Sequence, residues 1–422
     1  MARHGLIVTY YFPPAGGGGV QRWVKLIKYL SRSGWKFTVI AAPVEETTPR
    51  DYTFLDELPK NVEIIRTQPE SRPSGWKKWI GSKISHTYAQ RWLSAWYYIT
   101  DSRIRWNSAA VKSIKNQLQK NKFDVVIFSL PPYSLALLAA AFSVAQSVPV
   151  CLDLRDPWTI NPYKIYPTLL HHWIDERRER ESISKIDMFI SAYQSIPDHF
   201  ARTIPQFKPE QCLLLPNGYD EEDFTGIPEY TLPVPGDFHL AFSGSFYSHL
   251  NSPDLLFAAL KILKEQGTVI HFHHLGTSVY DVSQRAAHYG LQEQFHRWGY
   301  QVHQECLKIL QAMDGYVLLL DEREKNADKT VGGKLYEYLR LKKPVLAIVP
   351  DQGEAAQIIR EADSGIVCSG FRIDSVVQAV KELYRRQKIF SFKNIEQYSR
   401  QHQAIQLNRF LEEQIAASKK GI

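Results

Sequence analysis

Short apolar segments alternate with amphipathic segments along most of the chain. The first amphipathic segment has apolar residues at helical spacing: Val20, Trp23, Val24, Ile27 and Leu30. This spacing predicts a helix, and Gly34 predicts its end. Because apolar segments that predict strands lie on both sides of it, the order is strand, helix, strand. That order is typical of a parallel sheet covered by helices.

The alternation runs through two halves of the chain. In the first half the predicted strands are Leu6–Tyr10, Phe37–Ala41, Val62–Arg66, Asp124–Phe128, Val148–Asp153, Asp187–Ser191 and Cys212–Leu215. In the second half they are Phe238–Ser243, Val269–Leu275, Phe295–Gly299, Gly315–Leu320, Pro344–Val349 and Gly365–Cys368. Between them, residues 217–237 contain an Asn-Gly pair, prolines and acids, which predicts a linker.

The pattern therefore predicts an α/β protein with two Rossmann-like domains, at residues 1–216 and 238–394, whose parallel sheets face a central cleft. A length of 422 residues agrees, because one hydrophobic core stops growing well below that size. Ligands of open parallel sheets bind beyond the carboxyl ends of the strands. We therefore expect the chemistry in the loops that follow strands.

Composition narrows the location and the partners. The four cysteines are far apart and have no metal-ligand spacing, so we expect free thiols and a cytoplasmic protein. The first residues do not resemble a signal peptide, and the most apolar stretch, residues 135–150, is too short to span a bilayer. A net charge of +7 favours an anionic partner without identifying it. No nucleic-acid-binding motif is present, so nucleic acid is not expected.

Four consecutive glycines, Gly16 to Gly19, end the loop after the first predicted strand and directly precede the first predicted helix, which begins at Val20. Without Cβ atoms, the backbone amides of Gly17, Gly18 and Gly19 can approach an anion, which the helix dipole also favours. The pattern matches neither G-x-G-x-x-G nor a P-loop. The alternative to a ligand loop is a flexible turn.

The second half holds a similar arrangement in the segment 328–349. Gly332 and Gly333 precede a predicted helix whose first turn carries Lys334 and Glu337. Free amides and an ammonium group suit a diphosphate. A carboxylate one turn further can accept hydrogen bonds from two ribose hydroxyls. The alternative is a surface ion pair between Lys334 and Glu337.

Three further segments carry weaker signals. Gly244 and Ser245, after the first strand of the second half, would allow close approach to a phosphate. Arg155 and Asp156 follow a buried strand and either line the reaction centre or form a structural salt bridge. His271, His273 and His274 have no acidic or cysteine neighbour, so we predict no metal site there.

The stretch from residue 76 to residue 106 holds five of the ten tryptophans, interleaved with lysine and arginine. Aromatic and basic residues together suit the headgroup region of a membrane. A buried helical hairpin would also use many aromatic residues, and this alternative stays open. The stretch thus suggests peripheral membrane contact.

Seven motifs, in order and with matching spacing, resemble glycosyltransferase family 4 (group 1), a bacterial family with the GT-B fold. They are YYFPPAGGGGVQR, SLPPYS, LDLRDPW, LLLPNGYD, FSGSFY, RWGYQVHQE and GGKLYEYLRLKKPVLA. The resemblance implies a retaining transfer from a UDP- or GDP-linked sugar without an obligatory metal or cofactor. It also implies a carbohydrate or lipid-linked acceptor, and a C-terminal helix, about residues 395–422, that packs on the first domain.

The resemblance implies roles for individual residues. Gly17–Gly19 would approach the donor phosphate or the acceptor, and Gly244 and Ser245 the diphosphate. Tyr300 would lie beside the base, Glu337 would hold the ribose, and Lys334 would offset the charge of the diphosphate.

The sequence departs from the family pattern at two positions. Lys329 stands where the family has its first glutamate, so Glu322, Glu324 or Asp328 would supply the contact to the donor sugar. Arg155-Asp156 stands where the family often has His-Asp. A guanidinium cannot act as a base, so Arg155 would orient substrate or stabilise charge.

We therefore predict a glycosyltransferase that acts in polysaccharide or glycolipid synthesis. Two alternatives stay open, because a fold does not determine a function. One is a nucleotide-sugar 2-epimerase with the same fold, and the other is a non-catalytic subunit that binds a nucleotide-sugar. Lys329 and Arg155 are the features that keep the second alternative open.

Overall fold

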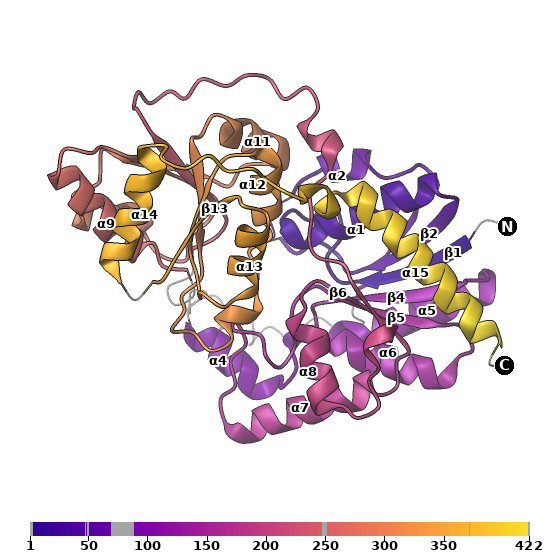
Figure 1. Cartoon of the computed structure of the whole chain (residues 1–422). Coiled ribbons are helices and arrows are strands. Elements are labelled where there is room, and N and C mark those ends of the chain that lie inside the picture. Colours follow the sequence, from indigo (N-terminus) through magenta and orange to yellow (C-terminus); the bar gives the residue numbers. More distant parts are fainter. Residues whose placement is uncertain are drawn as a thin grey trace. The chain divides into compact units, whose positions relative to one another are not determined.

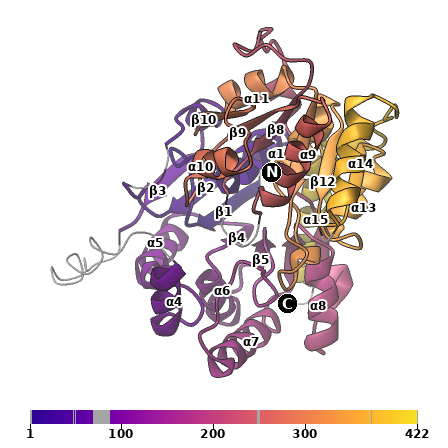
Figure 2. The same cartoon turned by 90° about the vertical axis from the view of Figure 1, so that its left-hand side faces the viewer.

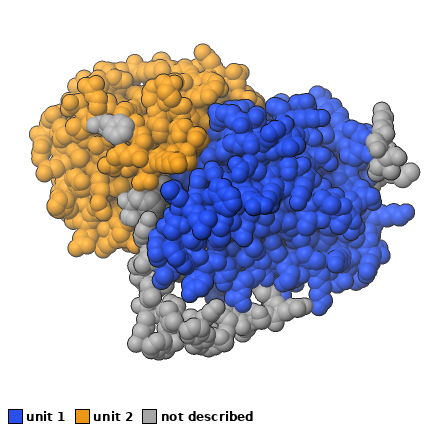
Figure 3. Space-filling model, turned by 90° about the horizontal axis from the view of Figure 1, so that it is seen from below, with its two compact units in different colours: residues 1–217, 400–422 blue, residues 218–399 orange. Residues whose placement is uncertain are grey.

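The computed structural model describes residues 3–46, 48, 50–68, 88–246, 251–370 and 372–420. The chain forms two compact units, coloured separately in Figure 3. The first unit comprises residues 1–217 and 400–422, and the second comprises residues 218–399. Each unit is described by itself.

The first unit contains a seven-stranded sheet in the order β3-β2-β1-β4-β5-β6-β7, among the described residues (Figure 1). Every neighbouring pair is parallel. The strands are β1 (Arg3–Thr9), β2 (Trp35–Ala41), β3 (Glu63–Arg66), β4 (Val125–Leu130), β5 (Val150–Leu154), β6 (Met188–Ser191) and β7 (Cys212–Leu214). The central strands are buried almost throughout, which explains why they read as continuous apolar runs.

Helices cover both faces of this sheet (Figure 1). They are α1 (Gly18–Arg32), α2 (Thr53–Asp56), α4 (Tyr88–Tyr97), α5 (Asn107–Lys120), α6 (Ser134–Ala145), α7 (Leu169–Ile183), α8 (Ser195–Thr203) and α15 (Arg400–Lys420), with 3₁₀ turns η1 (Ser102–Trp106) and η2 (Pro209–Gln211). Helix α1 ends where Gly34 takes a φ of 91° and its N–H bonds to the Ser31 carbonyl at 3.1 Å. Gly34 therefore ends the helix because it adopts a left-handed conformation that other residues avoid.

Helix α15 returns from the end of the chain and packs on α1 (Figure 1). Leu407, Leu411 and Ile415 join the same buried cluster as the apolar residues of α1 and β1. Trp35 also donates from Nε1 to Asn408 Oδ1 at 2.6 Å. The C-terminal helix therefore completes the core of the first unit.

The second unit contains a six-stranded parallel sheet in the order β10-β9-β8-β11-β12-β13, among the described residues (Figure 2). Its strands are β8 (His239–Ser243), β9 (His271–Leu275), β10 (Phe295–Gly299), β11 (Gly315–Leu319), β12 (Val345–Ile348) and β13 (Gly365–Cys368). Its helices are α9 (Asp254–Glu265), α10 (Val282–His288), α11 (His303–Gln311), α12 (Leu335–Leu341), α13 (Glu354–Glu361) and α14 (Ile373–Tyr384), with 3₁₀ turns η3 (Glu221–Phe224), η4 (Ala327–Lys329) and η5 (Ile395–Tyr398).

The two parallel-sheet α/β domains are those that the apolar pattern predicts, and each predicted strand overlaps an observed one. Of residues 217–237, which the sequence predicts as a linker, all but Asn217 belong to the second unit, and they include η3. The central cleft stays a prediction. Within the described residues, no helix combines the length and the apolar character that crossing a membrane requires.

Candidate functional site

The loop after β8 lies at the carboxyl edge of the second sheet and is held from two sides. The Ser243 N–H donates to the Tyr338 hydroxyl at 2.8 Å, and His274 Nε2 contacts the Gly244 carbonyl at 3.0 Å. A Cβ on Gly276 would lie 2.0 Å from the Gly244 carbonyl oxygen, so the next loop approaches as closely as backbone allows. Ser245 exchanges a hydrogen bond with Thr277 at 2.7 Å. The predicted phosphate loop is therefore rigidly supported.

Glu337 is the best-connected carboxylate near this edge. Its side chain extends from α12 and the residue is 4% exposed. Lys334 Nζ lies 3.1 and 2.9 Å from its two oxygens, and His303 Nε2 lies 3.2 Å from Oε1. Burial alone would raise the pKa of Glu337, but Lys334 and His303 outweigh it and lower the pKa to about 2. Glu337 is therefore a carboxylate at neutral pH.

Lys334 has the complementary shift. Burial would lower the pKa of its ammonium group, but the charge of Glu337 outweighs this and raises the pKa. Its side chain stays 26% exposed, so the charge that it carries is accessible from outside. The ion pair that the sequence offers as an alternative to a binding role is thus present, and it lies at the carboxyl edge of the sheet.

The glycine pair before α12 differs in its two members. The helix begins at Leu335, two residues later than Gly333. A Cβ at Gly332 would lie 2.8 Å from Leu318 Cδ1, whereas a Cβ at Gly333 would meet nothing within 4 Å. The lack of a side chain at Gly332 is therefore required by packing, whereas Gly333 leaves open space beside the backbone.

Tyr300, after β10, is 39% exposed, and its place beside the base stays a prediction.

His303 and Asp223 also belong to this cluster, and the sequence pattern predicts a role for neither. His303 is the first residue of α11 and is 6% exposed. Its Nδ1 lies 3.8 Å from Asp223 Oδ2, on the side opposite the Glu337 contact. The available signal for His303 was its place in the motif RWGYQVHQE, directly after the predicted base-binding strand. Asp223 carried no signal, because its segment was predicted as a linker.

The acids considered as substitutes for the family's first glutamate have differing surroundings. Glu322 Oε1 accepts a hydrogen bond from the Ser369 hydroxyl at 2.6 Å. Lys329, which stands at the family position, donates to Asn326 Oδ1 at 2.7 Å. A contact of Glu322, Glu324 or Asp328 with a donor sugar stays a prediction.

The glycine loop of the first unit is anchored by Arg155. The Arg155 guanidinium donates to the carbonyls of Leu130 and Pro131, each at 3.0 Å, and to the carbonyl of Gly19. A Cβ at Gly19 would lie 2.9 Å from Arg155 Nη1, so a larger residue here would have to displace the guanidinium. Gly17, with a φ of 100°, requires glycine for its backbone conformation, and Gly18 begins α1. Arg155 thus joins the glycine loop to the end of β4.

Arg155 is 5% exposed, so its predicted contact with substrate stays a prediction. The alternative was a structural salt bridge between Arg155 and Asp156. The guanidinium instead donates to backbone carbonyls. Asp156 is half-buried, and burial raises its pKa even though Arg155 acts in the opposite direction. Asp156 is therefore the more accessible polar group of the pair.

Asp153, on β5, accepts hydrogen bonds from three side chains. It is fully buried and accepts from Arg22 Nε at 3.0 Å, Trp23 Nε1 at 2.7 Å and the Ser129 hydroxyl at 2.8 Å. Arg22 in turn donates to the Pro216 carbonyl at 3.0 Å. This network joins α1, β4, β5 and the end of the first segment of the unit.

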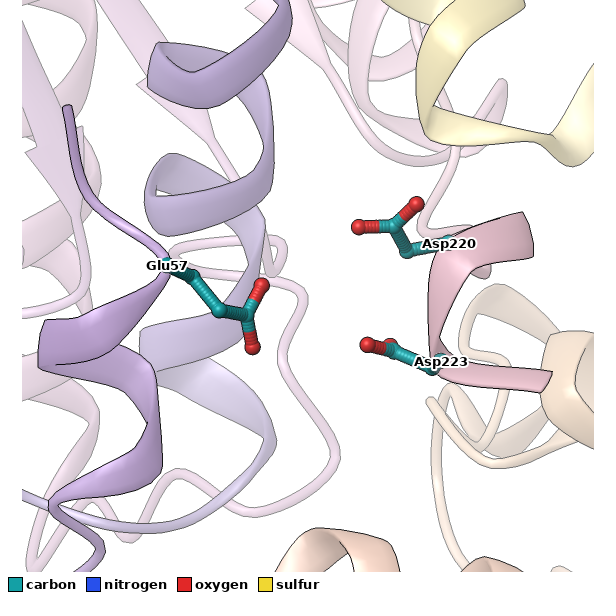
Figure 4. Close-up of side chains that lie close together, drawn as sticks. All are labelled: Glu57, Asp220 and Asp223. Atoms are coloured by element: carbon teal, nitrogen blue, oxygen red, sulfur yellow. The ribbon is translucent and has the colours of Figure 1, made fainter. Parts of the chain in front are cut away.

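Figure 4 draws three further carboxylates, those of Glu57, Asp220 and Asp223. Glu57 follows α2 in the first unit, where Lys25 Nζ lies 2.5 Å from Oε2. Asp220 precedes η3 in the second unit and accepts from the Glu222 N–H at 3.2 Å. Because the two units are not placed relative to one another, each carboxylate is considered within its own unit.

The histidines that alternate along β9 bond to neighbouring side chains. Trp298 Nε1 donates to His273 Nδ1 at 3.1 Å, so the remaining hydrogen of a neutral His273 ring is on Nε2. That nitrogen donates to His239 Nδ1 at 3.0 Å. His271 Nδ1 and His296 Nε2 share a second contact at 2.9 Å. Burial, followed by the neighbouring imidazoles, lowers the pKa of His273 to about 3.

The aromatic and basic stretch 76–106 is described only from residue 88 onward; Trp76, Trp79 and the lysines near them lie outside the described residues. Trp92 and Trp96, both on α4, stack on each other with their ring centroids 5.4 Å apart. Their exposed fractions are 38% and 46%. Trp106 is instead 1% exposed and donates to the Thr67 carbonyl at 3.0 Å. The stretch thus contains both core and surface tryptophans.

Comparisons with solved structures define the class of this fold. Sucrose-phosphate synthase from Thermosynechococcus elongatus has a TM-score of 0.69 at 12% identity and covers 98% of this chain and 100% of its own. WaaG, a glycosyltransferase involved in lipopolysaccharide biosynthesis, has a TM-score of 0.58 at 15% identity, with coverages of 96% and 95%. UDP-GlcNAc 2-epimerase from Neisseria meningitidis has a TM-score of 0.57 at 10% identity, with coverages of 97% and 100%. The chain has the GT-B fold.

Family comparisons then identify the family. The model of Glycosyltransferase Family 4 matches residues 16–223, and that of Glycosyl transferases group 1 matches residues 237–386. The chain belongs to this glycosyltransferase family, which confirms the resemblance found in the motifs. None of the curated protein sequences compared with the chain matches it.

Proposed function

We propose that the protein transfers a sugar from a UDP- or GDP-linked donor to an acceptor hydroxyl, with retention of configuration and without an obligatory metal. The observation that carries this proposal is the ionised, buried Glu337, which contacts Lys334 and His303 and whose neighbour Tyr338 holds the end of β8. A carboxylate offers about four acceptor positions, and Lys334 and His303 occupy three of them. A ribose hydroxyl would take the fourth.

The charge of Lys334 supports the leaving group. When the bond between sugar and diphosphate breaks, negative charge grows on the diphosphate. An ammonium group that is 26% exposed and whose pKa is raised is available to that charge at neutral pH. The backbone amides around Gly244 and Gly333 would add hydrogen bonds. In a retaining reaction the leaving phosphate can take the proton of the acceptor, so this mechanism requires no separate base.

The first unit would hold the acceptor. Its glycine loop is held by Arg155, and the half-buried Asp156 directly after Arg155 would be the polar contact for the acceptor. The exposed Trp92 and Trp96 suit an acceptor carried by a membrane, at its cytoplasmic face. We therefore place the reaction in polysaccharide or glycolipid synthesis.

The test uses the full chain with a panel of UDP-, GDP-, dTDP- and CMP-linked sugars. Thermal shift identifies the donor that binds, and release of the free nucleotide with and without acceptor then measures transfer. Glu337→Gln should weaken donor binding by about 10- to 100-fold, because a hydrogen bond to a charged group contributes about 1.5–3 kcal/mol. Glu305→Gln, in an exposed pair on α11, is the control. Absence of binding across the panel would overturn the proposal.

One alternative has a specific observation in its favour, which is the structural similarity to a UDP-GlcNAc 2-epimerase. An epimerase needs no acceptor, so the same donor panel without acceptor distinguishes the two. Appearance of an epimerised nucleotide-sugar would favour the epimerase. Activity that appears only in Lys329→Glu would instead favour a non-catalytic subunit.

A further inference from the structure

The strongest unassigned feature is a chain of buried polar groups that reaches Glu337 from behind. His303 comes from the start of α11, Glu337 from α12, and Asp223 from η3. All three are at most 6% exposed. Three separate segments of the second unit thus converge on one imidazole ring.

The orientation of the His303 ring follows from the chemistry of its two neighbours. Glu337 is ionised and can only accept, so the Nε2 of His303 that lies 3.2 Å from it carries a hydrogen. On the opposite side, Nδ1 faces Asp223 Oδ2 at 3.8 Å. The ring thus lies between two carboxylates, with a hydrogen bond to Glu337 and a longer electrostatic contact with Asp223. It can therefore hold the Glu337 carboxylate in one position.

Lys334 cannot supply the same support throughout a reaction cycle. It contacts both oxygens of Glu337, but its side chain is partly exposed and is the cation proposed to meet the diphosphate. A long, flexible side chain that turns toward the diphosphate loosens its contact with Glu337. His303 is buried and short, and its only proposed role is the contact with Glu337, so that contact would stay in place while Lys334 moves.

We propose that His303 is the positioning residue that keeps Glu337 aligned on the ribose of the donor while Lys334 engages the diphosphate. This inference rests on the proposed function and extends it to a residue to which the family comparison assigns no role. Its consequence is selective. Loss of the Nε2 hydrogen bond should weaken recognition of the nucleoside and leave recognition of the phosphates unchanged.

Two substitutions of His303 distinguish the roles of its two ring nitrogens. The amide nitrogen of glutamine falls near the position of Nε2, and that of asparagine falls near Nδ1. His303→Gln therefore keeps a donor toward Glu337, whereas His303→Asn removes it. His288→Asn, at an exposed histidine of α10, is the matched control.

The experiment measures binding of UDP, GDP and inorganic diphosphate to each full-length variant by calorimetry. For His303→Asn we expect the Kd of the nucleotide that binds the wild type to rise about tenfold, which corresponds to about 1.4 kcal/mol, while the Kd of inorganic diphosphate is unchanged. For His303→Gln we expect a nucleotide Kd close to the wild-type value. In turnover, His303→Asn should raise the donor KM more than it lowers kcat.

Three results would overturn the inference. Unchanged nucleotide binding in His303→Asn would remove the role, and equal losses of nucleotide and diphosphate binding would indicate a structural role only. If His303→Asn does not fold, nitrogen-15 NMR of the wild-type histidines decides. Saturating nucleotide should shift the His303 ring resonances, and unchanged resonances would be the third result against the inference. A wild-type chain that binds neither UDP nor GDP would instead overturn the proposed function itself.

Discussion

Two buried carboxylates, one in each unit, resemble each other in chemistry and differ in access. Asp153 in the first unit and Glu337 in the second each accept several hydrogen bonds from cationic and neutral donors. The partners of Asp153 are buried completely, with Arg22 at 0% exposure. One partner of Glu337, Lys334, has a side chain that is 26% exposed.

The difference teaches how to separate a structural ion pair from a binding site when both lie at the carboxyl edge of a sheet. A cation that is fully enclosed can compensate only the carboxylate beside it. A cation that reaches solvent can also compensate the charge of a ligand. By this criterion the Asp153 network holds the first unit together, and the Glu337 cluster is available for recognition.

The largest expected effect comes from breaking the enclosed pair. Asp153→Asn keeps the shape of the side chain but leaves Arg22 as a buried charge without its counter-ion. We expect the free energy of unfolding of the first unit to fall by about 3–5 kcal/mol. Denaturant unfolding measures this, with Asp187→Asn, an exposed aspartate, as control. A midpoint equal to that of the wild type would show that Asp153 is not structural.

The next effect concerns the response of the second unit to acid. His273 and His274 are fully buried, and burial lowers their pKa values to about 3 and about 4. Below pH 6.5 the unfolded chain protonates both rings while the folded unit does not, so stability falls as the pH falls from 6.5 toward 4. At pH 5 each ring lowers the free energy of unfolding by about 2 kcal/mol relative to pH 7.

Glu337 does not contribute in the same range. Its pKa is lowered from 4.5 to about 2, so its contribution is complete above pH 4.5 and is lost only as the pH falls toward 2. Amide hydrogen exchange in β9 and β10 is measured at pH 7, 6 and 5 and corrected for intrinsic rates. Protection of these strands should fall already between pH 7 and pH 5. Equal protection at pH 7 and pH 5 would contradict the lowered histidine pKa values.

The smallest effect tests the glycine loop. In Gly19→Ala the new methyl group would lie 2.9 Å from Arg155 Nη1 and would displace the guanidinium from its carbonyl partners. We expect a loss of about 1–3 kcal/mol in the free energy of unfolding. Gly333→Ala, which meets nothing within 4 Å, should change that free energy by less than about 0.5 kcal/mol. Similar losses in both variants would show that Gly19 is not closely packed.

Most of the fold could be predicted because parallel strands are buried on both faces and appear in the sequence as apolar runs. The strand β4, for example, reads VVIFSL and is buried at every position. Lys334 and Glu337 could be paired from the sequence because three residues along a helix return to nearly the same face. Local spacing thus determined the strands, the helices and the pairs within one turn.

His303 could not be found in this way, because 34 residues separate it from Glu337 and the contact depends on how α11 and α12 pack. Arg155 and Asp153 show the same limit. The sequence predicts Asp153 at the end of a strand and Arg155 in the loop that follows, but only packing decided that Asp153 is enclosed by α1 and that Arg155 turns toward the carbonyls of Leu130 and Gly19. The amino-acid order by itself determined which segments form the two sheets, since burial imposes a local pattern. The tertiary structure alone decided which charged groups meet and which reach solvent, since those contacts join residues that are distant along the chain.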